Sequence, residues 1–237
     1  MTAHIVASFD RDLEEVLSQT TAMGRLVLEQ MRGAADSLMN LDRGAAEAIM
    51  TRDAEVNGYE VKIDAHIEGI FARRQPTARD LRYLIGMSRV SVDLERMGDE
   101  IRNIARCVRD LPGLDAAVSA DRLTLQAAFD ALGLMIEDVL GALRMSDAAL
   151  ARRVIEADRQ VDEVYRRTVQ SLIIHMSENS GSAAGAVALT WVAKSIERVG
   201  DHTKNVAESV IYISEGADVR HEFYTDPVSA SDKAALS

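Results

Sequence analysis

Apolar residues recur at helical spacing through six long stretches of the chain, and short polar or proline-containing segments separate these stretches. In the second stretch, for example, Ile49, Val56, Ile63 and Ile70 fall on one stripe of a helical wheel. The spacing predicts helices over residues 10–40, 45–73, 78–109, 116–145, 148–177 and 183–214. Aromatic residues make up only 4% of the chain and only three prolines occur, which favours helices throughout. We therefore expect an all-α protein.

The breaks between the predicted helices contain residues that end one helix and begin the next. The turn over residues 40–44 carries side chains suited to helix capping. In the next break, Pro76 stops the preceding helix, and Thr77 with Asp80 has the form of a capping box. The Leu-Pro-Gly stretch at 111–113 is the boundary that we expect between two domains.

The second half of the chain repeats the plan of the first half. The string ERMGDEIRNIA at 95–105 aligns with ERVGDHTKNVA at 197–207, and six of the eleven positions are identical. Likewise, MTRDAEVNGYE at 50–60 aligns with IEADRQVDEVY at 155–165. The alignments predict an internal duplication that builds two tandem antiparallel three-helix bundles. We place the first bundle at residues 1–111, the second at 112–216 and a frayed tail at 217–237.

Acidic residues border the apolar stripes of these helices. Glu95 and Asp99 lie one helical turn apart on one face, and an interior glycine stands beside them. Like charges at this spacing cost about 0.2–0.5 kcal/mol, and an interior glycine costs about 1 kcal/mol relative to alanine. A bound cation and a close backbone approach would offset these costs. The candidate metal ligands are Asp53, Asn57, Glu60, Glu95 and Asp99, with Asp64 beside them, in the first repeat, and Asp158, Asp162, Glu197 and Asp201 in the second.

Other interpretations of these acids stay open. The acids can instead face solvent or pair with Arg102 and Arg106, which share the helix face of Glu95 and Asp99. A metalloenzyme or metal store is another possibility, although the Glu-x-x-His motif of di-iron bundle proteins is missing. A purely structural helical adaptor is a third. His202, next to Asp201, is a candidate for a further ligand.

Composition narrows the class of protein further. The formal net charge of −11 argues against a nucleic-acid partner, because such partners are recognised through a basic surface. Cys107 is the single cysteine, so no intramolecular disulfide is expected. The N-terminal residues lack a signal-peptide pattern, and the longest uncharged apolar run, at 183–193, is too short to span a bilayer. We expect a cytoplasmic protein.

Four strings together resemble one family. FARRQPTARDLR (71–82), SVDLERMGDEIRNIAR (91–106), SIERVGDHTKNVAESVIYI (195–213) and EGADVRH (215–221) closely resemble the PhoU family of phosphate-transport accessory proteins and phosphate-regulon regulators. The similarity covers nearly the whole chain. It implies two tandem three-helix bundles, often in a homodimer, with metal clusters held by E/D-x-x-x-D motifs.

The resemblance also assigns these motifs to residues. They fall on Glu95/Asp99 and Glu197/Asp201, facing Asp53/Asn57 with Glu60 and Asp158/Asp162. The second repeat departs from the pattern because Tyr165 stands where the first repeat has Glu60. Its cluster is therefore expected to be smaller or absent. Iron and zinc are the metals that we favour, as single ions or multinuclear clusters.

The function implied by the resemblance is regulatory and not enzymatic. Such a protein would couple the phosphate ABC transporter to the phosphate-sensing histidine kinase when phosphate is plentiful, limit phosphate uptake and hold the phosphate regulon off. Its partners would be the transporter's ATPase and the cytoplasmic PAS region of the kinase, so it would reach the membrane only through them. Arg74, Arg79 and Arg82, with Arg73, form the basic cluster that we expect to contact a partner.

Overall fold

The computed structural model describes residues 2–111, 113–114, 116–179, 181 and 183–220. In that part of the chain, six α-helices follow one another, which confirms the predicted all-α duplication. Their bounds are α1 Thr2–Asn40, α2 Arg43–Arg73, α3 Ala78–Arg109, α4 Ala116–Met145, α5 Ala148–Glu178 and α6 Ala183–Glu215. We call α1–α3 the first repeat and α4–α6 the second repeat. None of the described helices is long and apolar enough to cross a membrane.

The first helix begins at Thr2, eight residues earlier than the predicted residue 10. No glycine or proline occurs between Thr2 and Asp10, so nothing in the local sequence opposes helix propagation there. The predicted frayed tail falls mainly on residues 221–237, which lie outside the described part of the chain.

The same turn separates the first and second helices of each repeat. Asp42 caps α2 by accepting a hydrogen bond from the Ala45 backbone N–H at 2.9 Å. Asp147 caps α5 in the same way. The residue before each cap has a positive φ, 54° at Leu41 and 52° at Ser146. The duplication therefore preserves a strained turn together with the carboxylate that caps the helix after it.

The capping box predicted at the start of α3 does not form. Thr77 occupies the N-cap position, but its side chain makes no capping hydrogen bond. Instead, the Asp80 backbone N–H donates to the Thr77 carbonyl oxygen at 3.0 Å. Ala78 has a φ of 44°, and this left-handed residue changes the direction of the chain just where the threonine would cap it.

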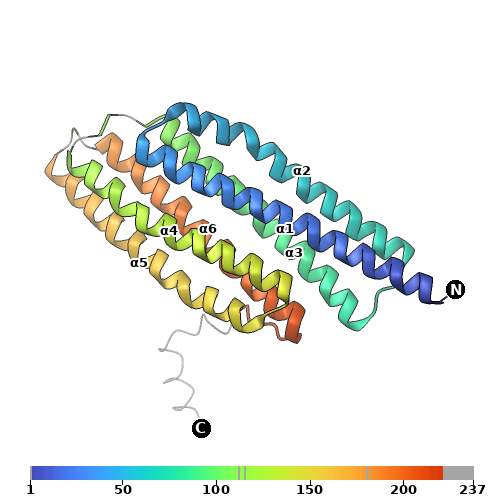
Figure 1. Cartoon of the computed structure of the whole chain (residues 1–237). Helices are drawn as coiled ribbons and strands as arrows, with labels where there is room; N and C mark the ends of the chain where they lie inside the picture. The colour runs from blue at the N-terminus through green and yellow to red at the C-terminus, as the bar shows by residue number, and fades with distance from the viewer. Residues whose placement is uncertain (1, 112, 115, 180, 182, 221–237) are drawn as a thin grey trace, which may run out of the picture.

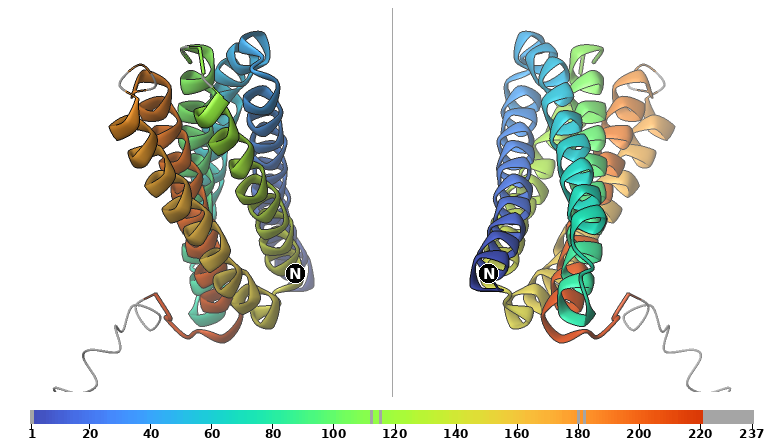
Figure 2. Two further views of the ribbon diagram at one scale, coloured as in Figure 1. Left: turned by 90° about the vertical axis from the view of Figure 1, so that its left-hand side faces the viewer. Right: turned by 90° about the vertical axis from the view of Figure 1, so that its right-hand side faces the viewer.

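The four helices α1, α3, α4 and α6 form the centre of the molecule, and α2 and α5 lie on opposite outer sides (Figure 1). Helix α2 packs on α1 and α3, whereas α5 packs on α4 and α6. The helices run along the long axis of the molecule, with the two repeats side by side (Figure 2). Each acidic stripe therefore lies where an outer helix meets a central one.

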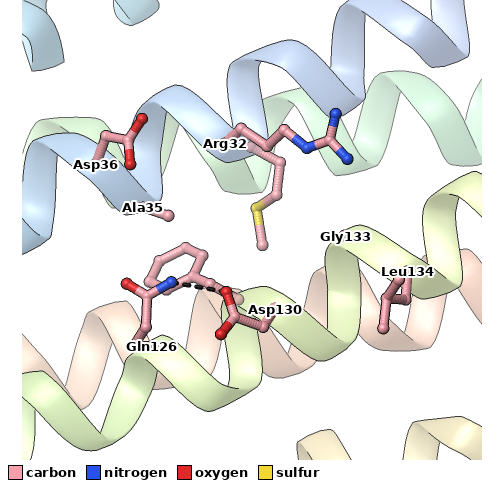
Figure 3. A pocket seen from close by; sticks show the side chains of 9 residues that line it. Arg32, Ala35, Asp36, Gln126, Asp130, Gly133 and Leu134 are labelled. Atoms are coloured by element: carbon pink, nitrogen blue, oxygen red, sulfur yellow. Dashed lines mark hydrogen bonds between the residues drawn. The ribbon is translucent and has the colours of Figure 1, made fainter.

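Two seams join the repeats. Along the first, α3 and α6 pack antiparallel in the most extensive contact between any two described helices. Gly86 lies so close to Ile213 that a Cβ at position 86 would overlap its side chain. Along the second seam, α1 packs on α4, and Arg32 forms an ion pair with Glu137. A hollow of about 440 Å³ opens between these two helices (Figure 3).

Candidate functional site

The structure brings the acids of the first repeat together across the contact of α2 and α3. We call Asp53, Glu60, Asp64, Glu95 and Asp99 the first acidic group. Burial raises the pKa of Glu95, and the nearby charges of Asp99, Glu60 and Asp53 raise it further. Burial also raises the pKa of Glu60, with Asp64 and Asp99 adding to the effect. The predicted ligands thus crowd one region, where their like charges repel.

A cation from the protein itself bridges this group. Arg102 Nη1 donates to Asp53 Oδ2 at 3.0 Å, and its Nη2 lies 2.9 Å from Asp99 Oδ1. Asp53 is only 3% exposed, and its pKa is raised by burial although Arg102 opposes that shift. Of the two arginines that share this helix face, Arg102 therefore pairs with the acids. Arg106 instead donates to Asn103 at 3.0 Å.

The second repeat has the same arrangement with a different cation. Lys204 Nζ donates to Asp158 Oδ2 at 3.2 Å and to Asp201 Oδ1 at 3.1 Å. Asp158 is 4% exposed, and burial raises its pKa to about 6, with smaller contributions from the charges of Asp162 and Asp201. We call Asp158, Asp162 and Asp201 the second acidic group.

Glu197, the remaining predicted ligand of the second repeat, has a different partner. It accepts a hydrogen bond from Lys194 at 2.6 Å. Lys194 Nζ also lies 5.4 Å from the ring centre of Tyr165, the residue that replaces Glu60. His202 Nδ1 lies 2.9 Å from Asp93 Oδ1 across the seam of α3 and α6. Glu197 and His202 therefore pair with other side chains and add no further ligand to the second group.

Glycines allow the outer helices to approach this closely. A Cβ at Gly98 would lie 3.2 Å from Val56 Cγ1 and 3.5 Å from Asp53 Oδ1. A Cβ at Gly200 would lie 2.7 Å from Asp158 Oδ1. The close backbone approach predicted for the interior glycines is therefore present in both repeats.

Three buried side-chain oxygen atoms on α2 and α5 lack hydrogen-bond partners among the described residues. They are Oδ1 of Asp53, Oδ1 of Asn57 and Oδ1 of Asp158. Unsatisfied buried oxygens are rare in folded proteins, and a bound cation would give such atoms a partner. Oxygen ligands of this kind suit hard cations.

The side chains as they lie do not form a metal centre. Among the described residues, no three His, Cys, Asp or Glu side chains are arranged to hold a metal ion. The first acidic group nevertheless fits a hard cation in donor chemistry, because its five carboxylates outnumber the two cationic side chains beside them, Arg102 and Arg96. The second group fits poorly, because its two best-placed aspartates already bind Lys204 and Glu197 is engaged elsewhere.

The role of Lys204 was not predicted from the sequence. The signal was present, since Lys204 aligns with Arg102 in the repeated string, but counting identical residues overlooks a conserved charge. Two further sets of contacts between α3 and α6 were not predicted either. Asp93 pairs with His202 and Asn205, and Glu100 pairs with Ser195 and Arg198. These contacts join residues of different repeats, and no local sequence pattern predicts them.

The predicted basic cluster at the Gln75–Pro76 turn is only partly available to a partner. Arg73 and Arg79 are exposed. Arg74 is half-buried and pairs with Asp12 at 3.7 Å. Arg82 is also half-buried and packs against Gly216 after the end of α6.

Known proteins resemble the chain over most of its length. The PhoU domain model matches residues 20–108 and 125–210, one match in each repeat. The chain is 37% identical to the phosphate-specific transport system accessory protein PhoU homolog of Pseudomonas putida, over 93% of this chain and 86% of that protein. It is 34% identical to the phosphate-specific transport system accessory protein PhoU of Escherichia coli (strain K12), over 93% of this chain and 91% of that protein.

Solved structures agree with these matches. The crystal structure of PhoU from Pseudomonas aeruginosa superposes with a TM-score of 0.83 at 34% identity, covering 88% of this chain and 100% of that one. The phosphate transport system regulatory protein PhoU from Streptococcus pneumoniae gives a TM-score of 0.82 at 27% identity, covering 89% and 99%. The chain therefore belongs to the PhoU family.

Proposed function

We propose that this protein is a negative regulator of the phosphate regulon, which couples the phosphate ABC transporter to its sensor histidine kinase and limits phosphate uptake. The observation that carries the proposal is similarity over 93% of the chain to accessory proteins of phosphate-specific transport systems. Both repeats take part in that similarity. On this proposal the protein works by binding partners and has no catalytic activity of its own.

The test is alkaline phosphatase activity of cells grown in phosphate-rich medium. Deletion of the gene should raise this activity, and complementation with the intact gene should silence it again. Unchanged low activity in the deletion strain, in an organism with no second gene of this family, would contradict the regulatory role.

The first acidic group is the part of the molecule that we propose binds metal. Its carboxylates come from two helices, repel one another and include a buried oxygen, Asp53 Oδ1, that has no hydrogen-bond partner within the described ranges. A hard divalent cation bound there would neutralise this charge and join α2 to α3. Iron and zinc remain the ions to test first.

Metal analysis of the purified protein tests this second proposal. The variant Glu95→Gln/Asp99→Asn should lose bound metal. The control Asp36→Asn/Asp130→Asn removes the same two charges from exposed positions on α1 and α4 and should keep it. Equal metal content in both variants would refute a site at the first acidic group.

For partner binding, we propose the exposed arginines on either side of the Gln75–Pro76 turn. The variant Arg73→Glu/Arg79→Glu should weaken capture of the transporter's ATPase or of the kinase PAS region. Arg166→Glu/Arg167→Glu is the matched control, because these two arginines are exposed on α5 in the other repeat. If both variants capture the partner equally weakly, the loss reflects a general effect of charge, and the arginines at the turn are not a docking surface.

A further inference from the structure

Arg102 and Lys204 hold equivalent positions in the two repeats, and each joins two aspartates from two helices. Arg102 contacts Asp53 on α2 and Asp99 on α3 at 3.0 and 2.9 Å. Lys204 contacts Asp158 on α5 and Asp201 on α6 at 3.2 and 3.1 Å. The duplicated geometry is built with two different cationic side chains, so the shared requirement at this position is a positive charge.

This positive charge does what a bound metal would otherwise do. A buried carboxylate needs a counter-charge, and Asp53 and Asp158 are the most buried carboxylates of their groups. In each aspartate, Oδ2 accepts a hydrogen bond from the cation, whereas Oδ1 faces the glycine of the neighbouring helix and has no hydrogen-bond partner in the part of the chain that the structure describes. A metal ion that takes Oδ2 as a ligand would compete with the cationic side chain that already donates to this atom.

We infer that Arg102 and Lys204 are tethered counter-ions, and that a divalent cation enters an acidic group only by displacing them. We also infer that it displaces Arg102 but not Lys204. The inference rests on the metal binding proposed above and adds the regulation of that site.

Exposure and charge distinguish the two groups. The side chain of Arg102 is 42% exposed, so it can swing into solvent, whereas that of Lys204 is only 13% exposed. The first group also has Glu60, Asp64 and Glu95 as further carboxylates. The second has Tyr165 in the place of Glu60, and Glu197 is held by Lys194. Only the first group therefore has enough free negative charge to expel its cation.

Titration with Mn²⁺, followed by the electron paramagnetic resonance signal of the free ion, tests the inference at the first group. Removing the tethered charge in Arg102→Gln should tighten Mn²⁺ binding about tenfold or more. Arg102→Lys keeps the charge and should bind Mn²⁺ as the intact protein does. The control Arg106→Gln removes an equal charge one turn further along α3 and should change the affinity less than about twofold.

The second group gives a matched test within the same chain. The intact protein should bind Mn²⁺ at the first group only, and Lys204→Gln should create an additional binding event that Asp201→Asn removes. Thermal unfolding supplies an independent measurement. EDTA should hardly change the melting temperature of the intact protein, whereas Arg102→Gln should melt lower in EDTA and recover when Mn²⁺ is added.

If Arg102→Gln fails to fold, the intact protein still tests the inference by NMR of its arginine side chains. Addition of Mg²⁺ should shift the Nε–H signal of Arg102, assigned through the Arg102→Lys variant, and leave that of Arg106 in place. An unmoved Arg102 signal at saturating Mg²⁺ would overturn the inference.

The outcomes separate the inference from the proposal on which it rests. If the intact protein and Arg102→Gln bind Mn²⁺ equally well, and Glu95→Gln/Asp99→Asn abolishes binding, the metal site stands and the competition is refuted. If no protein in the series binds Mn²⁺, both are refuted. Binding that appears only after Arg102 is replaced would overturn the inference that the metal displaces Arg102, because the intact protein would then keep its own positive charge in the group.

Discussion

At the scale of single residues, each acidic group depends on a glycine that faces an aspartate. Gly98 faces Asp53 and Gly200 faces Asp158, but the fit is not equally tight. A Cβ at position 200 would lie 2.7 Å from Asp158 Oδ1, and the other oxygen of this carboxylate, Oδ2, accepts a hydrogen bond from Lys204. At position 98 the nearest atom is Val56 Cγ1 at 3.2 Å.

We predict that Gly200→Ala is more destabilising than Gly98→Ala. Alanine favours a helix by about 1 kcal/mol over glycine, but overpacking of a buried contact costs about 1–3 kcal/mol. The overlap at position 200 should make that variant less stable by about 1–2 kcal/mol, while Gly98→Ala should stay within about 1 kcal/mol of the intact protein. Urea unfolding of the two variants measures the difference. Equal stabilities would show that Asp158 moves freely away from α6.

Glu208 is a second residue whose environment has a measurable consequence. It is 4% exposed on α6, and its Oε1 has no hydrogen-bond partner among the described residues. Burial raises its pKa. The charge of Lys204 opposes this shift, Asp93 adds to it, and the charges of Arg220 and Asp218 act in opposite directions. The folded state therefore holds the proton of Glu208 more tightly than the unfolded state does.

The sign of the pH effect follows from linkage. Because the folded pKa is raised, the stability that Glu208 contributes in its protonated form is lost as the pH rises from about 4.5 through the folded pKa. We predict that Glu208→Gln, which keeps the neutral shape, melts at a higher temperature than the intact protein at pH 8. The difference should be smaller at pH 5, as scanning calorimetry at the two values will show. A difference independent of pH would mean that Glu208 has the same pKa in the folded and unfolded states.

At the scale of elements, the two seams between repeats differ in how tightly they pack. Gly86 on α3 has no space for a side chain, because Ile213 of α6 fills it. Gly133 on α4 has nothing within 4 Å of its Cβ direction and lines the hollow between α1 and α4 (Figure 3). The α3–α6 seam is thus closed at Gly86, whereas the α1–α4 seam has room at Gly133.

The same substitution at these two glycines should have opposite effects. Gly86→Ala should destabilise the protein by about 1–2 kcal/mol, because Ile213 has to move. Gly133→Ala should stabilise it by up to about 1 kcal/mol through helix propensity. Chemical denaturation of the pair, with the intact protein as reference, checks both signs. A loss of stability in Gly133→Ala would show that the hollow closes in solution.

At the scale of the whole molecule, the extent of the α3–α6 contact makes the repeats interdependent. Ion pairs and hydrogen bonds cross this seam, including Asp93 with His202 and Glu100 with Ser195. The fully buried Met97 also packs at the seam, within 3.9 Å of Thr203 Oγ1. The predicted division between residues 111 and 112 therefore separates two sequence repeats. That these repeats are independent domains stays a prediction, and so does the homodimer.

We predict that the intact chain unfolds in a single calorimetric transition, with equal calorimetric and van't Hoff enthalpies. Residues 1–111 expressed alone would expose the apolar faces of α1 and α3 that the second repeat covers, and this fragment should melt at a lower temperature. Two separate transitions in the intact chain, one of them matching the fragment, would show that the repeats fold independently.

The six helices, their duplication and the positions of the acids along them could all be predicted from the amino-acid sequence. These features are local, because hydrophobic periodicity and i,i+4 spacing are properties of one helix and need no partner. Two local predictions were wrong in backbone detail, because α1 begins before residue 10 and the side chain of Thr77 makes no capping hydrogen bond. The unusual glycines of the repeated motif also predicted the close approach of neighbouring helices.

Which charged side chains pair with one another depends on how the helices pack. The sequence placed Arg102 on the same helix face as Glu95 and Asp99, but the register of α2 against α3 determines that its guanidinium reaches Asp53. The partnership of Lys204 with Asp158, and of His202 with Asp93, depends in the same way on how two helices are rotated and shifted against each other. Such contacts join residues far apart in the chain, and a distance between them exists only once the helices have packed.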